Sequence, residues 1–175
     1  MRPIICVTWL VALCFMPVYA APIPANGTVE AFFSPTGGCT ESIIREINGA
    51  QSEVLIQAYS FTSAPIAKAI IAAKRRGVKI EAVLDKSQRS AKYTAATFLT
   101  NAGIPLLIDD HHAIAHNKII IIDRNTLITG SFNFTKAAEE KNAENLLVIK
   151  NNQPLILQYL QNFERHRTHS EPYKR

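Results

Sequence analysis

Short apolar runs rich in isoleucine, valine and leucine alternate along the chain with amphipathic segments, in which apolar residues recur every three to four positions. The short runs predict buried strands and the amphipathic segments predict helices. Strands are predicted over 28–34, 52–61, 78–84, 105–108, 116–123, 126–133 and 144–149, and helices over 40–49, 63–76, 90–101, 135–142 and 154–166. Strands that alternate with helices favour an α/β fold, a mixed β-sheet flanked by helices on both faces in an α-β-α sandwich.

The N-terminus differs from this pattern. A single positive charge at Arg2 is followed by an almost wholly apolar run over 4–20, which ends in Val18-Tyr19-Ala20. Small residues at the third and first positions before a cut after Ala20, Val18 and Ala20, predict a secretory signal peptide over 1–20. An uncleaved membrane anchor is the alternative, because the run reaches the lower limit of the roughly 17–25 residues that span a bilayer.

Removal of the predicted signal peptide would leave three parts in the mature chain. A leader over 21–27 would precede one domain over 28–167 and a polar, basic tail over 168–175. The protein would be periplasmic or secreted. Cys39 would be the one cysteine left in the mature chain, so we expect no internal disulfide; Cys39 is either a buried apolar residue or the site of an intermolecular disulfide.

Composition is that of an ordinary folded protein, with 47% hydrophobic and 19% charged residues in 175. This excludes a disordered chain. The formal net charge of the whole chain is +5, and loss of Arg2 lowers it to +4. A positive mature chain is compatible with a nucleic-acid partner.

Polar residues interrupt the two apolar strands predicted over 116–123 and 126–133, which turn-forming residues join into a hairpin. Polar groups inside apolar strands are costly unless they are paired or used. With the loop centred on Arg124-Asn125, His116 lies opposite Asn133 and Lys118 opposite Ser131, so these four side chains share one face. An odd-length loop would break this register.

These residue types fit phosphoryl transfer. The reaction needs a nucleophile, groups that stabilise charge on the phosphate oxygens, and an acid for the leaving group. His116 can attack phosphorus, Lys118 offers a cation, and Ser131 and Asn133 offer hydrogen-bond donors. Glu144, on the next predicted strand, is the best candidate to orient the histidine ring. Because attack and protonation occur on opposite sides of phosphorus, a two-fold homodimer that brings two motifs together is the simplest complete site.

Asp123 stands apart from this group. It has the opposite strand parity to His116 and lies at the turn, so its role is more positional than chemical.

The pattern His-x-Lys-x₄-Asp-x₆-Gly-Ser-x-Asn is matched without a gap at His116, Lys118, Asp123, Gly130, Ser131 and Asn133. In this motif, and in the segments 58–62, 76–78, 83–86 and 142–145, the chain resembles the phospholipase D superfamily. Within it, the likeness is to short single-motif bacterial members, both the exported endonuclease and the small secreted phospholipases D.

This resemblance implies a phosphohistidine intermediate on His116, no cofactor and no metal, with His116 of a second subunit as general acid. It also implies that Lys118 and Asn133 bind phosphate and that Gly130 and Ser131 support the site. Glu144 matches the carboxylate that orients the histidine. Asp123 enters the catalytic set only as a motif residue.

Other polar residues carry weaker signals. His111 and His112 can ligate a metal or lie beside the site, although loop histidines are usually solvated; no Cys/His cluster has zinc spacing. Basic residues over 74–79 and 86–92 can follow a nucleic-acid backbone or simply be solvated. The segment 166–169 is interpreted as a frayed tail.

Three functions are therefore considered. The basic clusters and the apparent lack of an apolar membrane-docking loop favour an exported endonuclease acting on DNA or RNA. The alternative is a secreted phospholipase D that converts phosphatidylcholine to phosphatidate. An inactive binding module is a remote third, because it would be expected to have lost His116 or Lys118.

Overall fold

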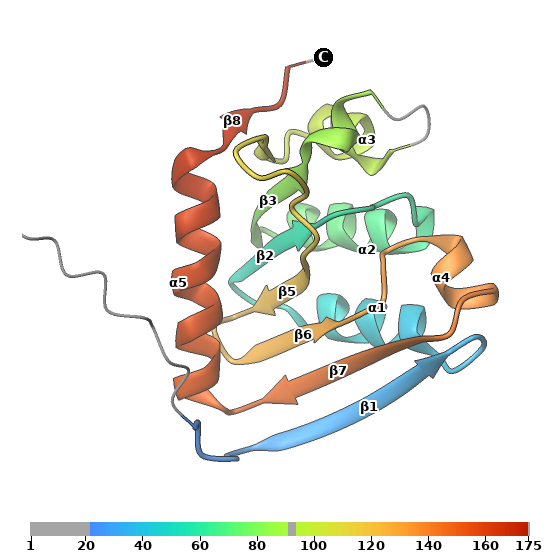
Figure 1. The fold of residues 1–175 in the computed structure, drawn as a ribbon, viewed down its shortest axis with the longest axis vertical. Helices are drawn as coiled ribbons and strands as arrows, with labels where there is room; N and C mark the ends of the chain where they lie inside the picture. The colour runs from blue at the N-terminus through green and yellow to red at the C-terminus, as the bar shows by residue number, and fades with distance from the viewer. Residues whose placement is uncertain (1–21, 91–93, 175) are drawn as a thin grey trace, which may run out of the picture.

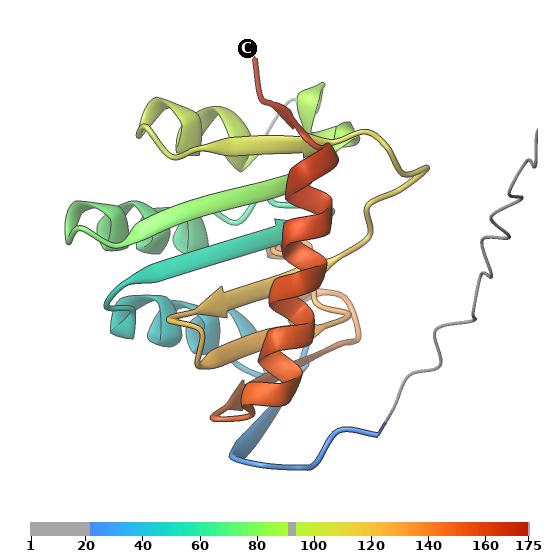
Figure 2. The same cartoon turned by 90° about the vertical axis from the view of Figure 1, so that its left-hand side faces the viewer.

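The computed structural model describes residues 22–90 and 94–174, which form a mixed eight-stranded sheet with helices on both faces (Figures 1 and 2). This confirms the predicted fold class. The strand order is β1-β7-β6-β5-β2-β3-β4-β8. The signal peptide predicted over 1–20 lies outside the described residues. Within those residues, no helix is both long enough and apolar enough to cross a membrane.

The predicted elements are present, with shifted ends. The strands are β1 (Thr28–Ser34), β2 (Glu53–Ala58), β3 (Lys79–Asp85), β4 (Leu106–Asp109), β5 (Lys118–Ile122), β6 (Thr126–Gly130), β7 (Glu144–Lys150) and β8 (Glu171–Pro172). The helices are α1 (Cys39–Gly49), α2 (Ala64–Arg75), α3 (Ala95–Asn101), α4 (Lys136–Glu140), α5 (Gln153–His169) and the 3₁₀ helix η1 (Lys86–Arg89).

The sheet has a hydrophobic core on each face. Helices α1, α2 and α3 cover one face, and α5 crosses the other (Figure 2). The all-isoleucine run of β5 serves both cores because strand side chains alternate: Ile120 joins the first core and Ile121 the second. From α5, Ile156 and Phe163 pack into the second core. The central strands are therefore buried on both faces, which explains their apolar sequences, whereas the edge strand β1 is largely exposed.

The predicted hairpin register is wrong. In the β5–β6 ladder, Ile119 pairs with Thr129 and Ile122 with Thr126, so the connecting loop has an odd length. Asp123 and Arg124 both take positive φ angles, 50° and 52°, in a tight turn. Continuing the ladder sets Lys118 level with Gly130, and the pairing of Lys118 with Ser131 and of His116 with Asn133 does not occur.

Helix starts also differ from the prediction. Gly38, and not Thr40, is the N-cap of α1, and the Glu139 carboxylate accepts the Thr40 amide at 2.7 Å. Cys39 is fully buried, and burial raises the pKa of its thiol to about 11, as expected for an apolar core residue. Helix α3 begins after Thr94, later than predicted.

The C-terminal segment is ordered structure. Helix α5 continues to His169, and β8 then pairs antiparallel with β4. The prediction of a frayed tail over 166–169 is therefore wrong, because these residues form the end of α5. The strand β4, with which β8 pairs, lies far away in the sequence.

Candidate active site

The polar motif lies at one edge of the sheet, here called the site edge. The ladders pair Ala58 with Lys118, Gly130 with Leu146, and Ser34 with Glu144. The carboxyl ends of β1, β2 and β6 therefore meet the amino ends of β5 and β7. The carboxyl ends of β3 and β4 lie on the same side, because β3 runs parallel to β2 and β4 runs parallel to β3.

His116 is held by backbone contacts on either side. The amide of Ala115 donates to the buried Asp85 carboxylate at 2.7 Å, and the carbonyl of Asn117 accepts the Tyr59 amide at 2.9 Å. The Tyr59 ring packs beside the imidazole, with 4.6 Å between ring centroids. The segment that carries His116 is thus fixed between the ends of β2 and β3.

Lys118 is a buried cation, only 6% exposed. Its Nζ donates to the His116 carbonyl at 2.8 Å and lies 5.2 Å from the centroid of the Tyr59 ring. Burial lowers the pKa of Lys118, and the nearby Glu144 carboxylate opposes that shift. A buried ammonium group beside His116 is well placed to attract an anionic group, because its field is weakly screened there.

Gly130 and Ser131 shape the end of β6. Gly130 has a φ of 152°, and a Cβ at this position would lie 2.2 Å from the Asn145 carbonyl oxygen, so no larger residue fits. The Ser131 hydroxyl accepts the Asn145 amide at 3.0 Å, and the Ser131 amide donates to the Asn145 carbonyl at 3.0 Å. Ser131 therefore extends the β6–β7 pairing. Its hydroxyl serves the scaffold.

Asn133 follows on the same segment. Its amide oxygen is buried and, among the described residues, has no hydrogen-bond partner. A buried acceptor in this condition is costly in a folded chain. The group that Asn133 can offer to a phosphate oxygen is the NH₂ donor of the same side chain.

Glu144 does not make the predicted contact with His116. Within residues 22–90 and 94–174, its hydrogen bond is with the Asn142 side-chain amide, at 3.3 Å, and no hydrogen bond joins it to His116. Its negative charge acts on Lys118, whose pKa it raises. The prediction that it orients the imidazole of its own chain is not met by these contacts.

Asp123 lies at the other end of β5 from Lys118, roughly 16 Å along the strand. Its carboxylate accepts the amides of Gln51, Ser52 and Glu53 at 2.8, 2.7 and 2.9 Å, and the Ser52 hydroxyl at 2.7 Å. Burial raises its pKa, but these hydrogen bonds outweigh it and leave the pKa of Asp123 below its usual value. These are the contacts of a scaffold residue, and they agree with the positional interpretation.

A polar pocket of about 440 Å³ opens beside His116 and Lys118. Helix α5 supplies its outer wall through Gln158, Asn162 and Arg165. These residues were not among the predicted site residues. Their spacing of four and three places them on one face of a helix, next to the apolar stripe, and that polar stripe was the available signal.

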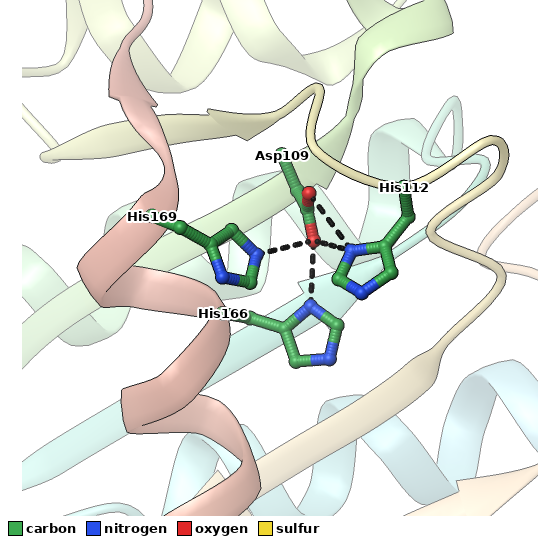
Figure 3. A group of neighbouring side chains, drawn as sticks. All are labelled: Asp109, His112, His166 and His169. Atoms are coloured by element: carbon green, nitrogen blue, oxygen red, sulfur yellow. Dashed lines mark hydrogen bonds and ion pairs between the residues drawn. The ribbon is translucent and has the colours of Figure 1, made fainter. Parts of the chain in front are cut away.

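Four of the five histidines gather away from His116. The Nδ1 atoms of His112 and His166 and the Nε2 atom of His169 all face the Asp109 carboxylate (Figure 3). His111 stacks on His169, with 4.8 Å between centroids. Burial raises the pKa of Asp109, but hydrogen bonds from the histidines more than offset it and hold that pKa well below its usual range.

The two basic clusters are differently placed. Arg76 donates to the carbonyls of Ile47 and Ala50, at the end of the sheet opposite His116. At the site edge, Arg89 pairs with the carboxylates of Asp110 and Glu171. Lys92 lies outside the described residues. The first cluster is therefore remote from the pocket, and the second is partly neutralised.

Comparison with known proteins shows the family to which the chain belongs. The family model described as "Cardiolipin synthase, PLD-like domain" matches residues 43–167. The chain belongs to the phospholipase D superfamily. It is 41% identical over 145 residues to a phospholipase D of Rickettsia typhi, with 83% of this chain and 71% of that protein aligned.

Solved structures agree on the fold. Nuc from Salmonella typhimurium, a phospholipase D family member, superposes with a TM-score of 0.81 and 38% identity, over 86% of this chain and 100% of that one. NucT from Helicobacter pylori superposes with a TM-score of 0.78 and 24% identity, over 85% and 100%. The protein is thus a phosphodiesterase of this superfamily, which sets aside the inactive binding module.

Proposed function

We propose that the protein is a phospholipase D that hydrolyses the head-group phosphodiester of phospholipids at the pocket beside His116. The observation that carries this proposal is the 41% identity to a Rickettsia typhi phospholipase D over most of both chains. An endonuclease was the first expectation from the sequence, and the similarity to phospholipases D favours the alternative.

Exposed apolar side chains support a lipid substrate. Ile114, two residues before His116, is 58% exposed, and Phe33, next to the Ser34–Glu144 pair, is 65% exposed. Both stand at the site edge, where a lipid surface would approach. No apolar docking loop was expected from the sequence, because Phe33 belongs to strand β1 and Ile114 is a single large apolar residue in its loop.

The proposed chemistry has two displacement steps. A ring nitrogen of His116 attacks phosphorus, the bond to the head-group oxygen breaks, and the head-group alcohol leaves with a proton. Water then attacks the phosphohistidine, which releases phosphatidate and frees the imidazole. Lys118 and the Asn133 side chain stabilise negative charge on the phosphate oxygens. No step in this scheme requires a metal ion.

A single chain supplies one such histidine, so we propose a two-fold homodimer whose second His116 protonates the leaving oxygen. The same arrangement gives Glu144 a role, because it can orient the histidine of the other chain, which it does not reach in its own. Adding excess His116→Ala protein to a fixed amount of wild type tests this: hybrid dimers would keep a single His116 and the rate should fall, whereas an unchanged rate would count against a shared site. An active monomer in sedimentation velocity would refute the design.

An endonuclease is the second candidate. Arg165 in the pocket wall favours it, because an arginine there can bind a nucleic-acid phosphate. The cluster around Arg76 does not, since it lies at the opposite end of the sheet.

One paired assay separates the two substrates. The mature protein is incubated in EDTA with choline-labelled phosphatidylcholine vesicles and, separately, with plasmid DNA. Choline release with intact DNA is expected. Cleaved DNA with intact lipid would overturn the proposal in favour of the endonuclease.

The exposed apolar residues provide a sharper arm of the same test. Ile114→Ser and Phe33→Ser are expected to lower the rate on vesicles several-fold and to leave a short-chain soluble substrate unaffected. Leu157→Ser is the matched control: it is 55% exposed but lies beside Arg124, at the far end of the sheet. Equal losses of the rate on vesicles in all three variants would show that Ile114 and Phe33 have no special role in contacting lipid.

Export also belongs to this proposal. We expect cleavage after Ala20 when the full chain is expressed in a bacterium, and mass spectrometry of the N-terminus of the exported protein checks it. Full-length protein held in the membrane fraction would favour the anchor.

A further inference from the structure

A second polar cluster lies at the site edge, outside the pocket. It joins Asp109, at the end of β4, to His112 in the loop that follows and to His166 and His169 in the last turn of α5 (Figure 3). Neither the proposed chemistry nor the superfamily motif uses it.

The cluster has the dimensions of a coordination shell. From Asp109 Oδ2, the distances are 2.6 Å to His166 Nδ1, 3.0 Å to His112 Nδ1 and 3.2 Å to His169 Nε2. All four donor atoms lie within 4.8 Å of one another. A tetrahedral zinc ion with bonds of about 2.0–2.1 Å separates its donors by about 3.3 Å. Small movements of the side chains would make room for an ion between them.

The charges at the cluster favour a cation. The Asp109 side chain is completely buried, and in the described part of the chain its ion-pair partners are all histidines. The neighbouring Arg89 is directed to Asp110 and Glu171 instead. A buried carboxylate without a lysine or arginine partner is costly, and a divalent ion held by three neutral imidazoles would balance it.

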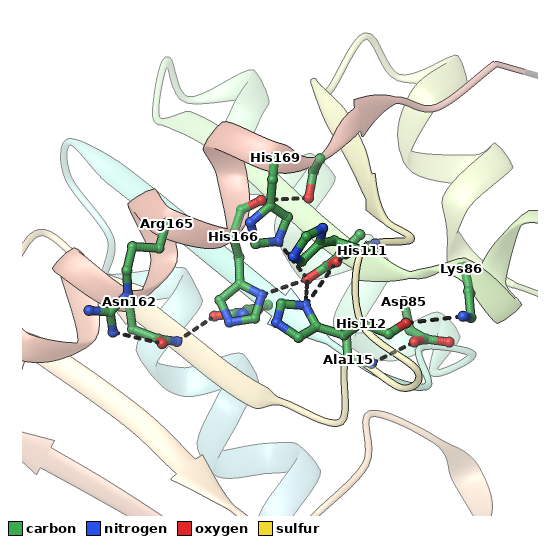
Figure 4. A network of polar contacts seen from close by, with 12 residues as sticks. Asp85, Lys86, His111, His112, Ala115, Asn162, Arg165, His166 and His169 are labelled. Carbon is green, nitrogen blue, oxygen red and sulfur yellow. Dashed lines mark hydrogen bonds and ion pairs between the residues drawn. The ribbon is translucent and has the colours of Figure 1, made fainter. Parts of the chain in front are cut away.

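The donor atoms are also held in place before any ion arrives. The His111 amide donates to Asp109 Oδ1 at 3.2 Å, and the His112 carbonyl accepts Lys86 Nζ at 3.0 Å (Figure 4). The Ser170 hydroxyl donates to the His166 carbonyl at 2.6 Å. Such outer contacts orient metal ligands in known sites.

His169 adds a further observation. Its Nε2 atom is buried and lies 3.2 Å from Asp109 Oδ2, but not in hydrogen-bond geometry, and no other described residue offers it a hydrogen bond. A buried nitrogen aimed at a carboxylate in this way is accounted for if it is a ligand.

We propose that Asp109, His112, His166 and His169 form a structural zinc site. Three imidazoles and one carboxylate suit this ion, and four protein ligands leave no open position for a substrate. The site joins three parts of the chain: the end of β4, the 110–115 loop that leads to His116, and the end of α5. Asn162 and Arg165 of the pocket wall lie on the preceding turn of that helix (Figure 4).

The site is tested by direct binding. Mature protein is stripped with EDTA, dialysed, and titrated with ZnCl₂ by calorimetry and with CoCl₂ by visible absorption. One zinc per chain, a Kd below about 1 µM, and the intense absorption of tetrahedral Co²⁺ are expected. At zinc about 100-fold above Kd, Tm is expected to rise by roughly 5–10 °C.

Matched variants locate the ion. His112→Ala and His169→Ala are expected to weaken zinc binding at least about 100-fold. His111→Ala removes an adjacent histidine outside the four-donor set and is expected to bind like the wild type. His116→Ala is expected to bind zinc normally while inactive, so this proposal and the proposed function can fail separately.

Folding is checked without metal. In EDTA, the partly exposed His112→Ala and His169→Ala variants are expected to match the circular dichroism of the wild type. The proposal is overturned if the wild type takes up no stoichiometric zinc at 10-fold excess over about 1 µM. It is equally overturned if His111→Ala loses binding as fully as His169→Ala, or if both ligand variants retain it; the cluster is then a metal-free hydrogen-bond network.

Discussion

Two polar groups share one edge of the sheet, and they differ in how the chain encodes them. The residues of the group around His116 lie close together in the sequence, within a single hairpin and its neighbouring strand. The group around Asp109 is assembled from two short segments, 109–112 and 166–169, that meet only when α5 crosses the sheet. A contiguous motif reveals chemistry before the fold is known, whereas an assembled cluster needs the fold.

Removing the imidazole of the first group has the largest expected effect. His116→Ala is expected to lower kcat roughly 10⁴-fold or more, because it removes the proposed nucleophile. Phospholipid hydrolysis checks this, with His111→Ala as the control for loss of a nearby ring. Retention of more than a tenth of the activity would move the nucleophile elsewhere.

Removing the buried cation is the next largest. Lys118→Ala is expected to lower kcat/KM about 10²–10³-fold through lost stabilisation of phosphate charge. Lys86→Ala is the matched control, since that ammonium group holds the His112 carbonyl and lies outside the pocket. Equal losses in both variants would show that the effect is general electrostatics.

Gly130→Ala tests the scaffold of the first group. The added Cβ would lie 2.2 Å from the Asn145 carbonyl at a φ of 152°, so the strands must separate. We expect a loss of about 2–3 kcal/mol in the free energy of unfolding by urea. Gly49→Ala is the control, because a Cβ there meets nothing within 4 Å. A neutral Gly130→Ala would contradict the described packing of β6 on β7.

Asp123→Asn tests whether the motif aspartate is scaffold. The folded-state pKa of Asp123 is lowered, so its stabilisation is present above its unfolded pKa of about 4 and is lost as pH falls through the folded value. We expect the variant to lose roughly 1–2 kcal/mol of unfolding free energy at pH 7, and the difference to shrink below pH 4. A pH-independent difference, or a large fall in kcat with unchanged stability, would contradict this role.

Much of the fold could be predicted from the sequence because strand and helix periodicities differ clearly. The hairpin register could not, because the positive φ angles at Asp123 and Arg124 create an odd loop that residue types alone do not specify. That error misplaced the partners of Lys118 and His116. The strands themselves were still correct.

The candidate site was predictable only where its residues are neighbours in sequence. Lys118 and Gly130 line the pocket beside His116, whereas Asn133 is not among its lining residues. Arg165 was missed because it reaches the pocket from a distant helix.

The histidine cluster had a weak sequence signal. Asp109 and His112, like His166 and His169, are separated by three positions, a spacing common among metal ligands. The two pairs are too far apart in the chain for that spacing to be decisive on its own.

The most direct test of the difference between the two groups is to trap the covalent intermediate. Wild type, His116→Ala and His169→Ala are mixed with a short-chain phospholipid, quenched within the first turnover at alkaline pH, digested and analysed by mass spectrometry. We predict a phosphatidyl adduct on His116 in wild type and in His169→Ala, and none in His116→Ala. An adduct on His112, His166 or His169, or none on His116 while wild type turns over, would contradict the account.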